Sequence, residues 1–255
     1  MPRSFVIDSF PESAAIYRNR YSIVAIDVIR ATTTAVTALS LGHRIFTVAT
    51  PEEARKMALE HPGALLVGEQ KGVLPDGFDL TNSPYQIAEK LSGSKMIILV
   101  SSSGTRLIVN AIGLTPVFIG CFRNLTALAR HLINHHQKIA LIGAGSQFDF
   151  RREDQMGCAY LGQKLIDAGY EPENKRTASI VKTWSKIDPR EITHGRSAAY
   201  LKRSGQEHDL TFILDNFDDL DLVPIMAGRE LVLDKLSRPQ AKIYEYAAPQ
   251  ERLAL

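Results

Sequence analysis

Short apolar runs alternate along the chain with stretches in which apolar positions recur every three to four residues. The runs are rich in Val and Ile, which favour β-strands, whereas the periodic stretches are typical of amphipathic helices. The pattern predicts strands at 5–7, 23–26, 45–48, 65–67, 96–100, 117–119, 139–142 and 211–214, and a late strand at 242–244. It predicts helices at 34–41, 51–59, 85–91, 105–112, 125–133 and 154–168.

The alternation of strands with helices predicts an α/β fold with a mainly parallel sheet between two helical layers, a three-layer α/β/α arrangement. Several of the strands are continuously apolar, as expected for strands that are buried on both faces. No linker rich in Gly or Ser divides the chain, so we expect one unit over 1–255. The segment after about residue 150 carries more helix and more charge, and a helical subdomain there is the alternative.

Composition narrows the class of protein. The chain has 255 residues, with 30 Lys and Arg against 28 Asp and Glu, a net charge of +2. This near-balance argues against a nucleic-acid binder, because little excess positive charge is available for counterion release. No run approaches the ~18 apolar residues of a membrane helix. The cysteines, Cys121 and Cys158, have no metal-binding spacing and are interpreted as buried thiols of a cytoplasmic protein.

Two nucleotide-binding motifs are absent or incomplete. The run 142–148 follows a strand and begins like a dinucleotide fingerprint, but Phe148 replaces its third glycine. The chain contains no phosphate-binding loop of the GxxxxGK[ST] type. A nucleotide-dependent enzyme is therefore the weakest of the functional hypotheses.

Four segments share the layout of a strand, a loop of small polar and acidic residues, and a helix. Because ligands bind at the carboxyl ends of strands in open parallel sheets, these loops are expected to meet at one edge. The first segment places Asp27, Arg30, Thr32 and Thr33 at a predicted helix start. An acid, a guanidinium and hydroxyl groups at a helix N-terminus suit a phosphate beside a metal ion.

The other three segments repeat this chemistry. The second ends a strand with Glu69, and the third carries Asp79 before the helix-start residues Asn82 and Ser83. In the fourth, a strand opens into a loop whose small residues let backbone N–H groups approach an anion. Its residues are Ser102, Ser103, Gly104 and Thr105.

Carboxylates are the remaining chemical signal: Asp27, Glu69, Asp79, Glu153 and Asp154. Together with a phosphate they are the usual ligands of Mg²⁺, a hard ion that prefers oxygen. No cluster of His and Cys suggests zinc. The sequence therefore favours metal-assisted phosphoryl transfer or hydrolysis, with the metal and a cation offsetting charge on the transferred group.

These segments resemble the signatures of the 2-phosphosulfolactate phosphatase family. The resemblance runs from about residue 23 to residue 224 and rests on 27–34, 68–69, 77–84 and 102–105. Asn124 and the runs 144–145, 153–154 and 194–196 follow in the family's order. The resemblance implies an α/β fold with its own topology and a Mg²⁺-dependent phosphatase that converts 2-phosphosulfolactate to sulfolactate, a step toward coenzyme M.

The resemblance also assigns roles. Asp27 and Glu69 are the first candidates for Mg²⁺, with Asp79 or Asp154 next, while a nucleophilic or basic role of Asp27 stays open. The expected phosphate ligands are Arg30, Thr32, Thr33, Asn82, Ser83, Ser102, Ser103, Gly104 and Thr105. A second cation is needed for the carboxylate or sulfonate, and its candidates are Arg106, Arg123, Arg152 and Arg196. His194 is a candidate to protonate the leaving alkoxide, with a structural role as the alternative.

Two departures from the family bear on the substrate. Ser103 stands where the family usually has Asn in Thr-Asn-Gly-Thr, and the loop 69–76 is idiosyncratic. Another 2-phospho-carboxylic acid is therefore an alternative substrate. The rival hypothesis is a non-catalytic module that binds a small phosphorylated metabolite, and a homodimer is the default expectation for assembly.

Overall fold

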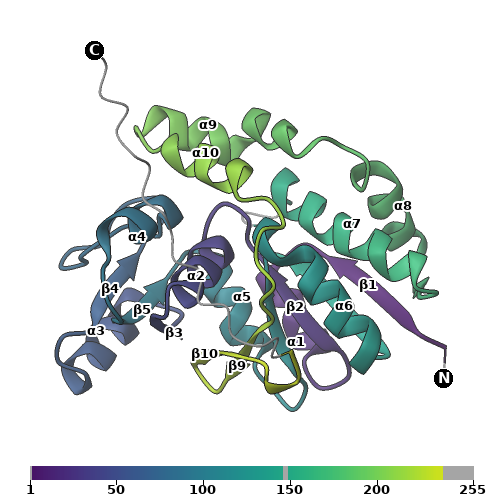
Figure 1. Cartoon of the computed structure of the whole chain (residues 1–255), viewed down its shortest axis with the longest axis horizontal. Helices are drawn as coiled ribbons and strands as arrows, with labels where there is room; N and C mark the ends of the chain where they lie inside the picture. The colour runs from purple at the N-terminus through teal and green to yellow at the C-terminus, as the bar shows by residue number, and fades with distance from the viewer. Residues whose placement is uncertain (1, 146–148, 238–255) are drawn as a thin grey trace.

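The structure is a computed structural model and describes residues 2–145 and 149–237. Its centre is one ten-stranded sheet (Figure 1). The strand order is β4 (Leu65–Gly68), β5 (Met96–Val100), β3 (Arg44–Thr47), β10 (Glu230–Leu233), β9 (Pro224–Ala227), β6 (Val117–Gly120), β2 (Ser22–Ile26), β7 (Lys138–Gly143), β1 (Ser4–Asp8) and β8 (Glu171–Pro172).

The sheet has two parallel sections joined by an antiparallel hairpin. Strands β4, β5 and β3 pair in parallel, as do β6, β2, β7, β1 and β8. The hairpin β9–β10 lies between them and pairs antiparallel with β6 on one side and β3 on the other. The sheet is thus mainly parallel, and its centre is made by the last two described strands.

Helices cover both faces of the sheet, which confirms the predicted three-layer fold. They are α1 (Ala14–Tyr17), α2 (Ala31–Ser40), α3 (Pro51–Glu60), α4 (Pro84–Lys90), α5 (Gly104–Ala111), α6 (Leu125–His135), α7 (Arg152–Asp167), α8 (Lys175–Trp184), α9 (Arg196–Arg203) and α10 (His208–Asp215). Along β2, Ile23 and Ala25 join the core under α2 and α5, whereas Val24 and Ile26 join the core under α6 and α7. This alternation follows from the two-residue period of a strand.

One predicted strand is wrong. Residues 211–214 lie inside α10, where Leu210 packs against α9 and Ile213 against the core below. A short apolar run fits a buried strand and a buried helix equally well. The strands β8, β9 and β10 were not predicted, and the predicted strand at 242–244 lies outside the described residues.

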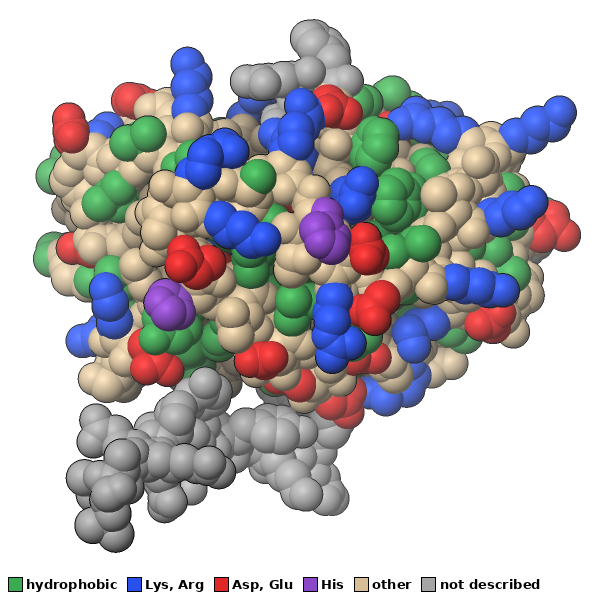
Figure 2. All heavy atoms as spheres, turned by 90° about the horizontal axis from the view of Figure 1, so that it is seen from above, with side chains coloured by type: hydrophobic (Ala, Val, Ile, Leu, Met, Phe, Trp, Pro, Cys, Tyr) green, Lys and Arg blue, Asp and Glu red, His purple; other side chains and the backbone are tan. Residues whose placement is uncertain are grey.

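The burial of both cysteines and the mixed charge of the surface are as expected from the sequence. Cys121 and Cys158 are buried, and burial raises the pKa of Cys121 to about 11 and that of Cys158 well above its usual value. No helix among the described residues is long and apolar enough to cross a membrane. On the face shown in Figure 2, basic and acidic side chains are interspersed.

A histidine cluster at the end of α6 makes stability depend on pH. His136 contacts His131, with ring centroids 5.4 Å apart, and shares a hydrogen bond of 2.8 Å with Ser22. Burial, with repulsion from His131 and His135, lowers the pKa of His136 from 6.5 to about 4. Because the folded state resists this protonation, its contribution to stability is complete above pH 6.5 and is lost as the pH falls toward 4.

We therefore expect the free energy of unfolding to fall on the order of 1 kcal/mol more between pH 7 and 4.5 in the wild type than in His136→Gln, because solvent screens part of the shift of this half-buried ring. Urea unfolding at both pH values measures the difference. The control is His61→Gln, which removes an exposed histidine and should keep the wild-type dependence. Equal pH dependence of the wild type and His136→Gln would contradict the prediction.

Candidate active site

The loops after β1, β2, β3, β4, β5 and β7 line one pocket of about 1210 Å³. The sequence predicted that the segments of Asp27, Glu69, Asn82 and Ser102 would meet, and the structure brings all four to this pocket. Helix α9 forms another wall, to which it contributes Arg196, Ser197 and Tyr200. The site is therefore built from segments spread over most of the chain.

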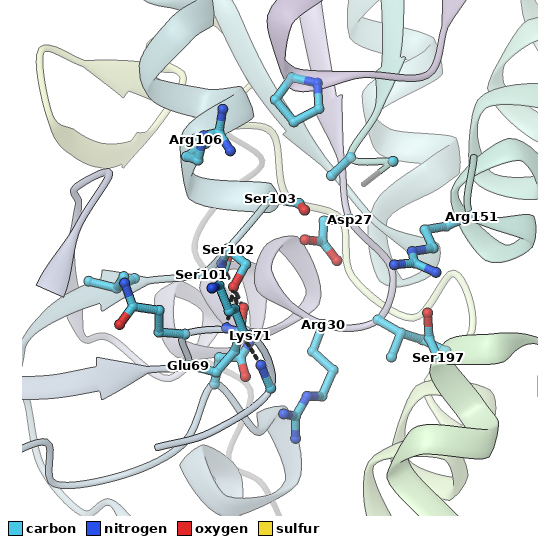
Figure 3. Close-up of a pocket in the computed structure, with 18 of the residues that line it drawn as sticks. Asp27, Arg30, Glu69, Lys71, Ser101, Ser102, Ser103, Arg106, Arg151 and Ser197 are labelled. Carbon is cyan, nitrogen blue, oxygen red and sulfur yellow. Dashed lines mark hydrogen bonds between the residues drawn. The ribbon is translucent and has the colours of Figure 1, made fainter. Parts of the chain in front are cut away.

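Asp27 is the buried acid of this pocket. It directly follows β2, is 7% exposed and forms two backbone hydrogen bonds with the Thr32 hydroxyl. Its carboxylate lies against the start of α5, where a Cβ on Gly104 would come within 2.2 Å of Asp27 Oδ2. Only glycine fits at that position, so Gly104 allows the carboxylate to reach the helix N-terminus. Figure 3 shows Asp27 beside Ser103.

The surroundings of Asp27 raise the pKa of its carboxyl group. Burial, followed by the charges of Glu69 and Glu153, raises the pKa of Asp27 to about 7, although the Ala31 backbone and Arg30 oppose the shift. Burial also raises the pKa of Glu153 and of Asp154. These acids lie too close together to be ionised without compensation, so the cluster requires protons or a cation.

Both carboxylate oxygens of Glu69 accept hydrogen bonds from the surrounding loops. Oε1 accepts a hydrogen bond from the Ser102 backbone at 2.6 Å, and Oε2 accepts one from the Gly72 backbone at 2.5 Å. The Ser102 hydroxyl adds a third, at 3.0 Å from Oε2. Glu69 lines the pocket, as predicted, but its contacts fix two loops against each other.

The structure does not place Asp154 and Asp79 as metal ligands of the pocket. Asp154 is buried and accepts hydrogen bonds from the Val28 and Ala144 backbones, so it ties the loop after β2 to the loop after β7. Asp79 is exposed and caps the Leu66 backbone at 2.7 Å. Neither lines the pocket. The sequence does not show that backbone N–H groups donate hydrogen bonds to the carboxylate oxygens of Asp154 and Asp79.

Glu153 is the acid that the prediction left out of its metal set. Its side chain is buried and, like Asp154, is not part of the pocket lining, but its Oε1 has no hydrogen-bond partner among the described residues. A buried carboxylate oxygen without a partner is costly, so it marks a place where a cation or donor is missing. A hydrogen bond with the Ser197 side chain lowers the pKa of Glu153, although burial raises it more.

Four predicted phosphate ligands support the loops instead of facing the pocket. The hydroxyl of Thr33 donates to the Val28 carbonyl, and that of Ser83 donates to Asp209. Thr32 is bonded to the Asp27 backbone, as described above, and Thr105 is bonded to the Ser101 backbone. A buried hydroxyl needs a partner, and a neighbouring backbone group supplies it.

Three other predicted phosphate ligands do line the pocket: Asn82, Ser102 and Ser103. The Ser102 hydroxyl is engaged with Glu69, whereas that of Ser103 forms no hydrogen bond with any described residue. Asn82 is buried, and its Oδ1 lacks a partner within the described part of the chain. Gly104 does not line the pocket. Its lack of a side chain leaves room for the Asp27 carboxylate.

Arg30 lines the pocket but directs its guanidinium away from Asp27 (Figure 3). Nη1 donates to Asp209 at 2.6 Å and to Gln206 at 2.7 Å, and both charged side chains are almost fully buried. Arg30 therefore joins the site to α10. The structure does not show Arg30 in its predicted role as a phosphate ligand.

The remaining cations divide into two groups. Arg106 and Arg196 line the pocket and form ion pairs with Glu12 and Asp149. Three other candidates lie outside it: Arg123 pairs with Asp219, Arg152 lies over Trp184, and His194 is exposed beside Glu191. The prediction of a second cation from Arg123 or Arg152 and of a proton donor in His194 is thus not supported by their positions.

The lining residues that were missed include Lys71, Arg151 and Ser197. Arg151 and Ser197 lie on the side of Asp27 opposite Lys71 and Glu69 (Figure 3). The loop around Lys71 was singled out as idiosyncratic, which was the only sequence signal for any of the three. Arg151 precedes α7 and Ser197 begins α9, so only the tertiary fold brings them to the pocket.

The site can therefore hold an anion among cations beside a buried acid. The family model for 2-phosphosulpholactate phosphatase matches residues 8–229. The chain is 31% identical over 221 residues to a protein of Symbiobacterium thermophilum, covering 82% of this chain and 93% of the relative. It is 29% identical over 216 residues to one of Clostridium beijerinckii, covering 81% and 89%. Both relatives are named "Probable 2-phosphosulfolactate phosphatase".

Proposed function

Because the chain belongs to the 2-phosphosulfolactate phosphatase family, we propose that it is a Mg²⁺-dependent phosphatase that hydrolyses 2-phosphosulfolactate to sulfolactate and phosphate. The observation that carries the proposal is the contact between the Asp27 carboxylate and the start of α5. It places a buried acid beside backbone N–H groups that have no partner inside the helix.

The start of α5 is the proposed site of the phosphoryl group. Helix N-termini bind anions through free N–H groups and the helix dipole. The Ser103 hydroxyl adds a donor that no described residue occupies, and Arg151 lies on the other side of Asp27 (Figure 3). These groups would orient the phosphate ester and stabilise the charge that spreads over its oxygens during transfer.

The acidic groups fit Mg²⁺. Asp27 and the unpartnered Oε1 of Glu153 are hard oxygen donors in a cluster with excess negative charge. No group of three or more His, Cys, Asp or Glu side chains among the described residues is arranged as a complete metal site. Mg²⁺ keeps several waters and binds through one or two carboxylates together with substrate phosphate, so Asp27 and Glu153 would be enough to hold it. The bound ion would supply charge stabilisation for the phosphoryl oxygens.

Phosphate release from 2-phosphosulfolactate and from phospholactate, with and without Mg²⁺, tests the function. We expect release to fall at least about a hundredfold in a chelator and to recover when Mg²⁺ is added. Full activity in the chelator would contradict the metal requirement. Calorimetric binding of the esters without phosphate release would favour the non-catalytic module instead.

The metal ligands can be tested without turnover. Glu153→Gln should weaken Mg²⁺ binding at least about tenfold in calorimetry, because it removes a charged oxygen donor. The matched control is Glu52→Gln, since Glu52 lines the pocket but is largely exposed beside Arg55. Equal Mg²⁺ affinity of the two variants would remove Glu153 from the metal site.

A further inference from the structure

A tight turn brings Lys71 to the pocket wall. Gln70 and Val73 exchange both backbone hydrogen bonds, at 2.9 and 3.1 Å, so Lys71 and Gly72 occupy the tip. Both residues have positive φ angles, 52° and 84°. Such turns favour Asn, Asp or Gly, and a lysine held in the left-handed region is strained. The surrounding structure must therefore impose this conformation.

Contacts with three elements fix the turn. The Lys71 backbone donates to the Ser102 hydroxyl at 2.6 Å, and the Gly72 backbone donates to Glu69. The Tyr200 hydroxyl donates to the Gly72 carbonyl, and its ring leaves no room for a Cβ on Gly72. Ser102 and Glu69 also hold the loop that leads into α5. The turn is thus locked to the loop that we propose binds phosphate.

The charge of Lys71 has no partner within the described part of the chain. Among the other pocket cations, Arg30, Arg106 and Arg196 form ion pairs with acids. The Lys71 ammonium has neither an ion-pair nor a hydrogen-bond partner in residues 2–145 and 149–237. In Figure 3, Lys71 lies beside Ser102 on the side of Asp27 opposite Arg151. A cation whose backbone is fixed on the pocket wall and whose charge has no partner among the described residues is available for an anion of the substrate.

We propose that Lys71 binds the second acid group of the substrate, the carboxylate or sulfonate, and so sets the preference for phosphate esters that carry one. This inference rests on the proposed function, which places the phosphate at Ser103 and the start of α5. Ser102 joins that position to Lys71 through the hydrogen bond from the Lys71 backbone. In a 2-phospho acid the phosphate oxygen and the carboxylate are bonded to the same carbon atom, and a sulfonate is bonded to the next one, so one molecule can meet both groups of the protein.

The test compares two esters that differ at one group. Phospholactate carries a carboxylate, and isopropyl phosphate has a methyl group in its place. In Lys71→Met, the ratio of kcat/KM for phospholactate to that for isopropyl phosphate should fall about 10- to 100-fold, mainly through KM, because a charge-assisted contact is lost. Lys71→Gly removes the same charge and suits the positive φ, so it keeps the test valid if Lys71→Met folds poorly.

Lys56→Met is the matched control. Lys56 is an exposed residue of α3 that does not line the pocket, and its replacement should leave the ratio at the wild-type value. A ratio within twofold of wild type in both Lys71 variants, or an equal fall in Lys56→Met, would overturn the proposal.

The outcome separates this inference from the proposed function. Calorimetric affinities for the two esters give the same ratio without turnover. A wild type that hydrolyses neither ester contradicts the phosphatase function, and the affinity ratio still decides the role of Lys71. A wild type that hydrolyses phospholactate while the Lys71 variants keep its ratio contradicts the role of Lys71 alone.

Discussion

Replacing Asp27 by Asn should lower kcat for phosphate release at least about a thousandfold while leaving the fold intact. The amide has the same shape, so Gly104 still accommodates it, but it lacks the charge needed beside Mg²⁺ and phosphate. The raised pKa of Asp27 shows that burial and neighbouring acids disfavour its ionised form in the folded protein. Removing that charge should therefore keep or raise the free energy of unfolding near neutral pH.

Phosphate release, Mg²⁺ calorimetry and urea unfolding together test this prediction. Lower activity with equal or greater stability is the combination that distinguishes a functional acid from a structural one. The control is Glu12→Gln, since Glu12 lines the pocket but forms an exposed pair with Arg106. It should change kcat less than about threefold. An Asp27→Asn variant with wild-type kcat and an unchanged Mg²⁺ requirement would contradict our assignment of the site.

The location of the site was predicted more accurately from the sequence than the roles of its residues. Strand-end loops meet because parallel strands present their carboxyl ends together, and that rule needs only the order of strands and helices. It identified Asp27, Ser103 and Glu69 as residues at the pocket. It gave no information on which oxygens would be used by backbone N–H groups. Both oxygens of Glu69 and of Asp154 are used in this way, which separates these two acids from Asp27.

The fold shows the same division between local and long-range information. The parallel strands except β8, and the helices α2 to α7, were predicted from apolar periodicity, which is a local property. The hairpin β9–β10 was missed because each strand has four residues and pairs with β6 or β3, which are distant in sequence. Arg151 and Ser197 were missed for the same reason: their role depends on where α7 and α9 pack.

Arg30 has a different role from the one that its position near a helix start suggested. A guanidinium near a helix start suggests a phosphate ligand, yet here its Nη1 contacts the buried carboxylate of Asp209. Asp209 also accepts a hydrogen bond from Ser83 at 2.5 Å. One carboxylate therefore connects α10, the start of α4 and the loop after β2. Such a connection makes the pocket wall depend on a residue far from it in sequence.

Asp209→Asn should accordingly destabilise the protein by about 3–5 kcal/mol, because it leaves the buried charge of Arg30 without its partner. The midpoint of urea unfolding measures the loss. Asp221→Asn, which breaks the exposed pair with Arg130, is the control and should cost less than about 1 kcal/mol. Adding Arg30→Met to Asp209→Leu should recover part of the stability, since it removes both buried charges together. An Asp209→Asn variant as stable as Asp221→Asn would show that water or another acid compensates Arg30. In that case the guanidinium would be free to act on phosphate, as the sequence suggested.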